Sequence, residues 1–275
     1  MKKRTISGVC YALILIGIFC LRQFVDYRLF HALTCFLVIM GTFEFARAFK
    51  NQIIKGAREL SFVFSVLFVP VYCLGEYIII GKAGWIFALA LILLMEIITS
   101  ILAIIQKANK KQFLSSISLY LYPALFLLTM LLANDMGANA FIVLLLAFVV
   151  SPCSDSMAYF VGSLIGGKKL CPKISPNKTW AGAIGGTIGG VISGIVVYLI
   201  FNPVVNFFSP ILFFVLVGLF ASIATLFGDL FESLIKRSVG IKDMGKIMPG
   251  HGGVLDRIDG TMFAMTFIYL VFLFV

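Results

Sequence analysis

The chain has 275 residues, of which 61% are hydrophobic and 12% charged, with a mean hydropathy of +1.08. This composition excludes an ordinary soluble protein, because a water-facing surface does not tolerate so many apolar side chains. The formal net charge of +10 suits anionic lipid headgroups, and we expect membrane lipids rather than nucleic acid as neighbours. We therefore predict an all-α integral membrane protein.

The predicted membrane spans are apolar runs of about 20 residues, the length needed to cross the hydrocarbon core. The first follows Met1–Arg4, and we expect an uncleaved helix there because no small-residue cleavage site precedes Arg22. About nine transmembrane helices are predicted, near residues 5–21, 29–46, 60–80, 84–105, 115–133, 138–165, 181–201, 208–228 and 260–275.

Lys and Arg side chains fall in alternate connecting segments. Residues 2–4, 47–58, 107–111, 168–178 and 236–257 hold 19 of the 22. The others are Arg22, Arg28 and Lys82. Because cytoplasmic segments are enriched in positive charge, this pattern predicts a cytoplasmic N-terminus and a C-terminus on the outer side.

Polar residues divide the predicted membrane domain into two regions. Residues 1–134 carry few of them, and we expect a transmembrane scaffold there. Residues 135–275 hold most of the acidic residues that we expect to carry chemistry, so we expect a catalytic region there. Of the acids within the scaffold spans, Glu44 lies one turn from Arg47, which favours a local ion pair over catalysis, whereas Glu96 has no evident partner.

Small residues recur every fourth position in the span 181–201, at Gly182, Gly186, Gly190 and Gly194. Glycines at this spacing allow two helix backbones to approach closely in a membrane. We expect tight packing within the chain, while a homodimer interface or a substrate groove is left open.

Three polar clusters converge on the predicted cytoplasmic side: Asp155, the loop 168–180, and the segment 229–259. Their acids offer oxygen ligands only, without a His or Cys cluster, which favours Mg²⁺ or Mn²⁺ over zinc. Their Lys and Arg side chains and several glycines could surround phosphate groups. The pattern indicates a divalent cation and a polyanionic substrate.

The third cluster contains one long motif of mixed residue types, which is a highly specific family signal. It reads Ser233-x2-Lys236-Arg237-x4-Lys242-Asp243-x-Gly245-x3-Pro249-Gly250-His251-Gly252-Gly253-x2-Asp256-Arg257-x-Asp259. It resembles the signature of the phosphatidate cytidylyltransferases, the CDP-diacylglycerol synthases. A second stretch, Asp155-x2-Ala158-Tyr159-x2-Gly162 with Ser175-Pro176-Asn177-Lys178-Thr179-Trp180-x-Gly182, is similar to that family's other polar block, although Ala181 stands where the family usually has Glu.

The resemblance implies an enzyme that joins CTP to phosphatidate with Mg²⁺, releasing pyrophosphate. The charge alternation puts its site at the cytoplasmic face, and we expect a bacterial inner membrane because no eukaryotic targeting signal is evident and the nine-helix chain is compact. It implies metal ligands at Asp229 and Asp256, with Asp259 a weaker candidate. The other implied catalytic residues are Lys236, Arg237, Lys242 and His251. The implied substrate-binding residues are Ser175, Lys178, Asp155, Asp243, Gly252, Gly253 and Arg257. Another nucleotide-dependent lipid enzyme, such as a polyprenol kinase, and a membrane transporter are the alternatives.

Overall fold

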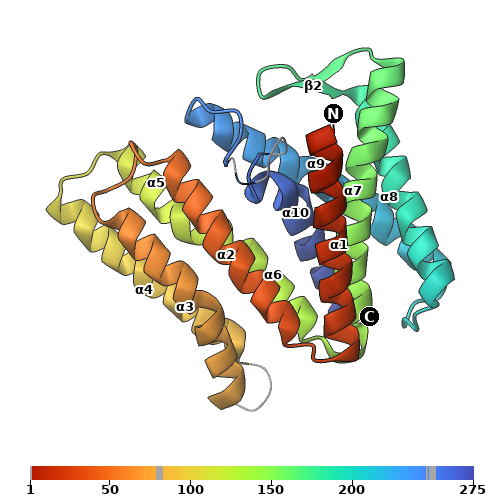
Figure 1. The fold of residues 1–275 in the computed structure, drawn as a ribbon, viewed down its shortest axis with the longest axis horizontal. Helices are drawn as coiled ribbons and strands as arrows, with labels where there is room; N and C mark the ends of the chain where they lie inside the picture. Colours follow the sequence, from red (N-terminus) through yellow and green to blue (C-terminus); the bar gives the residue numbers. More distant parts are fainter. Residues whose placement is uncertain (1, 79–82, 246, 248–251) are drawn as a thin grey trace. The chain divides into compact units, whose positions relative to one another are not determined.

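A computed structural model describes residues 2–78, 83–245, 247 and 252–275. Most of this described chain is helical, with one small hairpin of strands (Figure 1). The elements are α1 (Lys2–Phe24), α2 (Leu29–Ala48), α3 (Ala57–Ile78), α4 (Gly84–Ile105), α5 (Lys110–Leu121), α6 (Ala124–Asn134), η1 (Gly137–Asn139), α7 (Ala140–Ile165), β1 (Lys169–Cys171), β2 (Ser175–Thr179), α8 (Trp180–Phe201), α9 (Pro210–Ser238) and α10 (Leu255–Phe272).

Seven helical segments among the described residues are long and apolar enough to cross a membrane: Leu29–Ala48, Ala57–Ile78, Gly84–Ile105, Lys110–Asn134, Gly137–Ile165, Trp180–Phe201 and Pro210–Ser238. They match the predicted spans from the second to the eighth. The first and the ninth predicted spans are not among these seven. The apolar part of α1 is only Ala12–Phe24, and the first turns of α10 contain the charged residues Asp256, Arg257 and Asp259.

Prolines affect the predicted spans in two ways. Pro70 and Pro152 lie inside α3 and α7, which continue past them. Pro123 instead separates α5 from α6, so the predicted span near 115–133 consists of two consecutive helices. A proline has no N–H to donate and crowds the preceding turn, which explains the interruption at Pro123.

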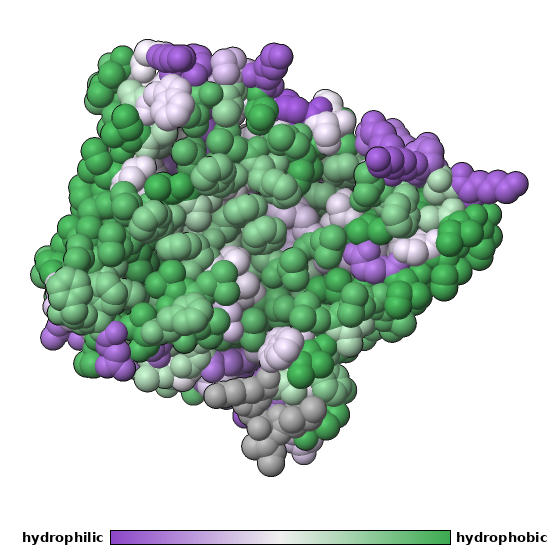
Figure 2. Space-filling model, turned by 180° about the vertical axis from the view of Figure 1, so that it is seen from behind, coloured by the Kyte–Doolittle hydropathy of each residue, from purple (hydrophilic) through white to green (hydrophobic). Residues whose placement is uncertain are grey.

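Large apolar side chains cover much of the molecular surface, and Figure 2 shows hydrophobic residues over most of the face it presents. Ile104 is 77% exposed, Leu164 84% and Leu199 67%. In water such a surface would be strongly unfavourable, whereas in lipid it contacts acyl chains at no such cost. The surface therefore fits a membrane environment.

The chain forms two compact units. The first comprises residues 1–132 and returns to include 243–256, and the second comprises 133–242 and 257–275. In the first unit, Phe64 packs edge-on against Tyr120 with ring centroids 5.3 Å apart. Both side chains are fully buried, and the Tyr120 hydroxyl accepts a hydrogen bond of 3.0 Å from Thr99.

Two of the basic connecting segments meet at one end of the first unit. The backbone N–H of Ile54 donates to the Ser116 hydroxyl over 2.9 Å. The Gln106 side chain accepts from the N–H of Lys55 and donates to its carbonyl oxygen. The segment after α2 is therefore tied to the segment after α4, as expected for two connections on the same side of a membrane.

The glycine stripe of α8 packs within the second unit, which confirms the expectation of tight packing within the chain. A Cβ added to Gly186 would lie 3.0 Å from the carbonyl oxygen of Ser154 on α7. A Cβ added to Gly190 would lie 2.6 Å from the carbonyl oxygen of Gly218 on α9. The stripe lets α8 approach both neighbours, and any larger side chain would push them apart.

Helix α10 continues into the second unit against α9. Gly228 faces the carbonyl oxygen of Asp259 and Cα of Gly260 so closely that no side chain would fit there. The rings of Phe231 and Phe263 lie 5.6 Å apart. This close packing brings Asp259 of α10 beside the polar end of α9.

Candidate active site

The predicted loop 168–180 forms a β-hairpin between α7 and α8. Strands β1 and β2 pair antiparallel, with Lys169 opposite Thr179. Gly166 and Gly167 adopt positive φ angles of 66° and 90°, which end α7 and turn the chain into the hairpin. At the other end, the Thr179 hydroxyl accepts a hydrogen bond from the N–H of Gly182 and caps α8.

The hairpin carries Lys178 onto the acidic end of α9. Its ammonium nitrogen lies 2.5 Å from Oδ2 of Asp229, and the two side chains are each 23% exposed. A partly buried, charge-assisted contact of this kind is short and directional. The structure thus brings together one residue implied to bind substrate and one implied to bind metal.

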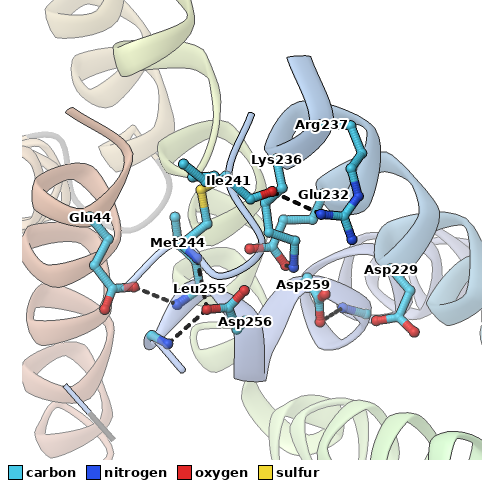
Figure 3. Close-up of polar contacts among 12 residues, drawn as sticks. Glu44, Asp229, Glu232, Lys236, Arg237, Ile241, Met244, Leu255, Asp256 and Asp259 are labelled. Carbon is cyan, nitrogen blue, oxygen red and sulfur yellow. Dashed lines mark hydrogen bonds and ion pairs between the residues drawn. The ribbon is translucent and has the colours of Figure 1, made fainter. Parts of the chain in front are cut away.

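Two further acids lie next to Asp229 in the second unit. The Asp259 side chain interacts electrostatically with both Asp229 and Glu232, and it accepts a hydrogen bond of 2.8 Å from the N–H of Gly260. Glu232 is fully buried, and Nζ of Lys236 lies 3.6 Å from its Oε2 (Figure 3). Carboxylates this close repel one another unless protons or cations lie among them.

Asp155 belongs to the same electrostatic neighbourhood. It lies on α7 and interacts through charge with Asp229, Lys178 and Arg257. Four elements of the second unit, namely α7, the hairpin, α9 and α10, therefore contribute charged groups to one cluster. We call these residues, including the lysine, the acidic cluster: Asp155, Lys178, Asp229, Glu232 and Asp259.

Arg237 orders the chain around this cluster. Its guanidinium donates to the carbonyl oxygen of Ile174 in the hairpin over 3.3 Å and to that of Ile241 over 2.9 Å. A planar guanidinium has five N–H donors, so it can hold both carbonyls and still offer donors to a phosphate. Its structural contacts do not exclude the substrate contact predicted from the resemblance.

The cluster has the donor chemistry of a Mg²⁺ site, because every acid in it offers only oxygen. Across the part of the chain that is described, no three His, Cys, Asp or Glu side chains are already arranged to hold a metal ion. In this arrangement the Lys178 ammonium contacts Asp229. A metal ion binding at Asp229 would be attracted by the nearby carboxylates and would have to displace this ammonium. The residues fit a divalent cation in type, and its binding stays a prediction.

Asp256 has a different local role in the first unit. Its Oδ2 accepts hydrogen bonds from the N–H of Met244 over 3.0 Å and from that of Gly253 over 2.7 Å (Figure 3). These bonds hold the backbone of Met244 and of Gly253 to the first turn of α10. A metal-binding role for Asp256 also stays a prediction.

The remaining predicted residues are more scattered. Ser175 pairs with Cys171 within the hairpin. Lys242 and Asp243 are exposed after α9, and Gly252 adopts a φ of 88°. Ala181 lies in the first turn of α8. His251 lies outside the described residues, as do Lys246, Pro249 and Gly250 of the same motif.

Sequence reasoning missed two residues of functional interest. Glu232 carries no predicted role, although it stands one helical turn after Asp229 and so shares its face. That spacing could have identified it. Glu44 was expected to pair locally with Arg47, whereas its carboxylate bonds the backbone of Val254 and Leu255. No local signal could reveal a partner 210 residues away.

Comparison with known proteins agrees with the motif. Residues 2–275 match the profile described as the cytidylyltransferase family. This chain belongs to that family. The match covers α1 through α10 and therefore includes the scaffold helices as well as the polar motifs.

Curated relatives of this family member are named phosphatidate cytidylyltransferase. The protein of Brucella abortus is 42% identical over 130 residues, covering 47% of this chain and 46% of the relative. That of Bacillus subtilis is 44% identical over 125 residues, covering 46% and 45%. That of Thermotoga maritima is 39% identical over 142 residues, covering 50% and 51%. The chain thus spans about half the length of the curated relatives it matches.

Proposed function

We propose that this chain transfers the cytidylyl group of CTP to phosphatidate, forming CDP-diacylglycerol and pyrophosphate. The observation that carries the proposal is the Lys178 contact with Asp229 inside the acidic cluster. Membership of the cytidylyltransferase family and the names of the curated relatives support the same reaction.

The reaction needs little covalent chemistry from the protein. An oxygen of the phosphatidate phosphate attacks the α-phosphorus of CTP, and the bond from that phosphorus to the bridging oxygen of the β-phosphate breaks. Pyrophosphate leaves with the electron pair. A phosphate monoester is already nucleophilic, so holding the two substrates in line and stabilising the developing charge supplies most of the catalysis.

The basic residues suit that task. Lys178 and Lys236 stand beside carboxylates, so a phosphate oxygen entering the cluster would meet ammonium donors already oriented by the protein. Arg237 holds the hairpin that carries Lys178, so its contact with Ile174 keeps that lysine in place. The lipid substrate would present its headgroup to this end of the second unit.

Asp229, Asp259 and Glu232 are the residues that would hold a divalent cation, with Mg²⁺ favoured by their oxygen ligands. When bound, such a cation would offset the negative charge of the phosphate groups. Asp229 would then exchange its present Lys178 contact for the cation, which would leave the ammonium available to the substrate.

We place the reaction at the cytoplasmic face of a bacterial inner membrane. The alternation of basic segments supports this side, and the relatives named above are bacterial. CTP is a cytoplasmic solute and phosphatidate is a membrane lipid, so the two substrates meet at this face.

The decisive experiment uses purified full-length protein in detergent with CTP, phosphatidate and Mg²⁺. The expected products are CDP-diacylglycerol and pyrophosphate in equal amounts. A lipid kinase would instead release a nucleoside diphosphate, and a transporter reconstituted in vesicles would move solute without consuming CTP. Either result would overturn the proposal.

A further inference from the structure

Exposed basic side chains gather at one end of the first unit, and the proposed reaction does not use them. They lie in the connection from α2 to α3, in the connection from α4 to α5, or in the first helical turn that follows each connection. All of them are exposed to solvent. We call this set the basic surface: Lys50, Lys55, Arg58, Lys107, Lys110 and Lys111.

Hydrogen bonds hold the two connections against each other. The Gln106 side chain accepts a bond of 3.2 Å from the N–H of Lys55 and donates one of 3.0 Å to the carbonyl oxygen of the same residue. The N–H of Ile54 donates to the Ser116 hydroxyl over 2.9 Å. Figure 1 shows both connections at the same end of these helices. The basic side chains therefore belong to one structured surface rather than to two independent loops.

Few acids offset the charge of the basic surface. Glu59 is the only acid in residues 50–59 and 106–116. Within the part of the chain that the structure describes, no ion pair joins a side chain of the basic surface to an acid. Like charges on one surface repel one another and attract anions from the surroundings. An anion bound among these side chains would relieve that repulsion.

Lys107 stands at a position that favours glycine. Its φ angle is 50°, in the left-handed region. The N–H of Ala108 donates to the carbonyl oxygen of Ala103 over 2.9 Å. The N–H of Lys107 donates to that of Ile104 over 3.1 Å. This pair of bonds ends a helix with a left-handed residue, which is usually glycine. A lysine there costs free energy that glycine would not, so its side chain serves a purpose beyond ending α4.

The two lysines that begin α5 are also unfavourable for their own helix. Lys110 is the first residue of α5, and Lys111 follows it. Asn109 and Gln112 form a neutral capping box, and the first turn contains no acid. The N-terminus of a helix is the positive end of its dipole, so positive side chains there destabilise the helix. A negatively charged partner from outside the helix would remove this penalty.

The surroundings of the basic surface favour a lipid as that partner. The two connections join helices that are long and apolar enough to cross a membrane, so they lie at the level of the lipid headgroups. Ile104 and Ile105, in the last turn of α4, are largely exposed and shortly precede Lys107. An anionic lipid offers acyl chains to the isoleucines and a phosphate to the lysine. A soluble anion offers only the charge.

We propose that the basic surface is a binding site for an anionic membrane lipid, with the lipid phosphate among its lysines and the acyl chains against the end of α4. The site goes beyond the proposed reaction and does not depend on it, because none of its residues belongs to the acidic cluster. The probe lipid is phosphatidylglycerol, whose headgroup carries one negative charge. Phosphatidylcholine, which has no net charge, is the comparison.

The first test measures lipid affinity by native mass spectrometry of the full-length protein in a neutral detergent. The triple variant Lys107→Gln, Lys110→Gln and Lys111→Gln should raise the dissociation constant for phosphatidylglycerol about tenfold or more. Its dissociation constant for phosphatidylcholine should stay as in the wild type. Unchanged affinity for phosphatidylglycerol would overturn the proposal.

A second triple variant controls for net charge. Lys168→Gln, Lys169→Gln and Lys173→Gln remove the same charge from exposed lysines of the β-hairpin in the second unit. Their effect on the dissociation constant for phosphatidylglycerol should be less than about twofold, because exposed charges outside the site are largely screened. An equal loss of affinity in the two triple variants would show that only net charge matters, and the proposed site would fail.

A single substitution at Lys107 separates lipid binding from folding. Lys107→Gly should raise the unfolding midpoint in detergent, because glycine adopts the left-handed conformation without strain. The same variant should bind phosphatidylglycerol about fivefold more weakly. Lys107→Arg keeps the charge and should keep the affinity. If the lysine only complements the dipole at the end of α4, the glycine variant will bind the lipid as the wild type does, which would contradict the proposal.

Inorganic phosphate distinguishes a lipid site from a site for a soluble anion. Phosphate added at the ionic strength of a chloride control should leave phosphatidylglycerol bound, since the acyl chains contribute to its affinity. Displacement by phosphate but not by chloride would assign the basic surface to a soluble anion and would overturn the proposal.

Discussion

Nζ of Lys178 lies 2.5 Å from Oδ2 of Asp229, although 51 residues separate the two in sequence. The contact joins the hairpin after α7 to the polar end of α9, and it places opposite charges from two of the predicted polar clusters side by side. A substrate phosphate or a divalent cation entering this position must compete with it. The pair therefore provides the most direct test of the site.

Replacing Lys178 should separate its charge from its packing. Lys178→Met keeps the length of the side chain but removes the ammonium, and we expect turnover to fall about 100-fold or more. Lys178→Arg keeps the charge with a different donor geometry and should retain part of the activity. Steady-state cytidylyl transfer by the purified variants is the measurement. Lys173→Met, at an exposed lysine of the same hairpin, is the control and should stay near wild type.

Neutralising the carboxylates should abolish a metal-dependent reaction. We expect EDTA to stop turnover of the wild type, and Asp229→Asn and Asp256→Asn each to lower it about 100-fold or more. Asp229→Asn removes an anionic group from the acidic cluster, and Asp256→Asn weakens the acceptor of the Met244 and Gly253 N–H groups. Asp259→Asn should have the same direction with a smaller effect. Activity is measured across a Mg²⁺ titration.

Thermal unfolding of the same variants in detergent provides the control. The Lys178 contact is partly exposed, so Asp229→Asn should change the free energy of unfolding by no more than about 1 kcal/mol. Near-wild-type turnover of Asp229→Asn at low Mg²⁺ would refute its assignment. A large loss of stability would point instead to a purely structural ion pair.

The glycine stripe of α8 predicts a contrast in stability. Gly190→Ala places a methyl group 2.6 Å from the carbonyl oxygen of Gly218, so we expect overpacking to cost about 1 to 3 kcal/mol. Gly17→Ala in α1 meets nothing within 4 Å and should be neutral or stabilise the helix by up to about 1 kcal/mol. Unfolding midpoints in detergent test this contrast, and equal effects of the two changes would contradict the packing.

The alternating charges predict which side each segment faces. Single cysteines at Lys110 and Lys173 should react with a membrane-impermeant thiol reagent only after the cytoplasmic side is opened, whereas a cysteine at Val275 should react from outside. The background is a variant whose six native cysteines have been replaced. A C-terminus that reacts only from the cytoplasmic side would show that the nine-span prediction is wrong by an odd number of spans.

Sequence alone determined the membrane class and the family. Apolar runs long enough to span lipid predicted the helices from α2 to α9, since helix formation satisfies every backbone group within the segment itself. The motif from Ser233 to Asp259 identified the family because so many polar residue types at fixed spacing have no other reason to occur in this chain. The spacing of Gly182, Gly186, Gly190 and Gly194 predicted tight packing, and contacts with α7 and α9 confirmed it.

Only the tertiary structure decided which charged residues meet. The predicted loop 168–180 is a hairpin whose folding carries Lys178 to Asp229, and the partner of Glu44 is the start of α10 rather than a neighbour on its own helix. Helical and strand periodicity report which residues share a face, because they arise from local backbone geometry. They carry no information on which face another part of the chain will contact. Long-range pairs such as Glu44 with Leu255 are therefore fixed by packing and by the need of buried N–H groups for an acceptor.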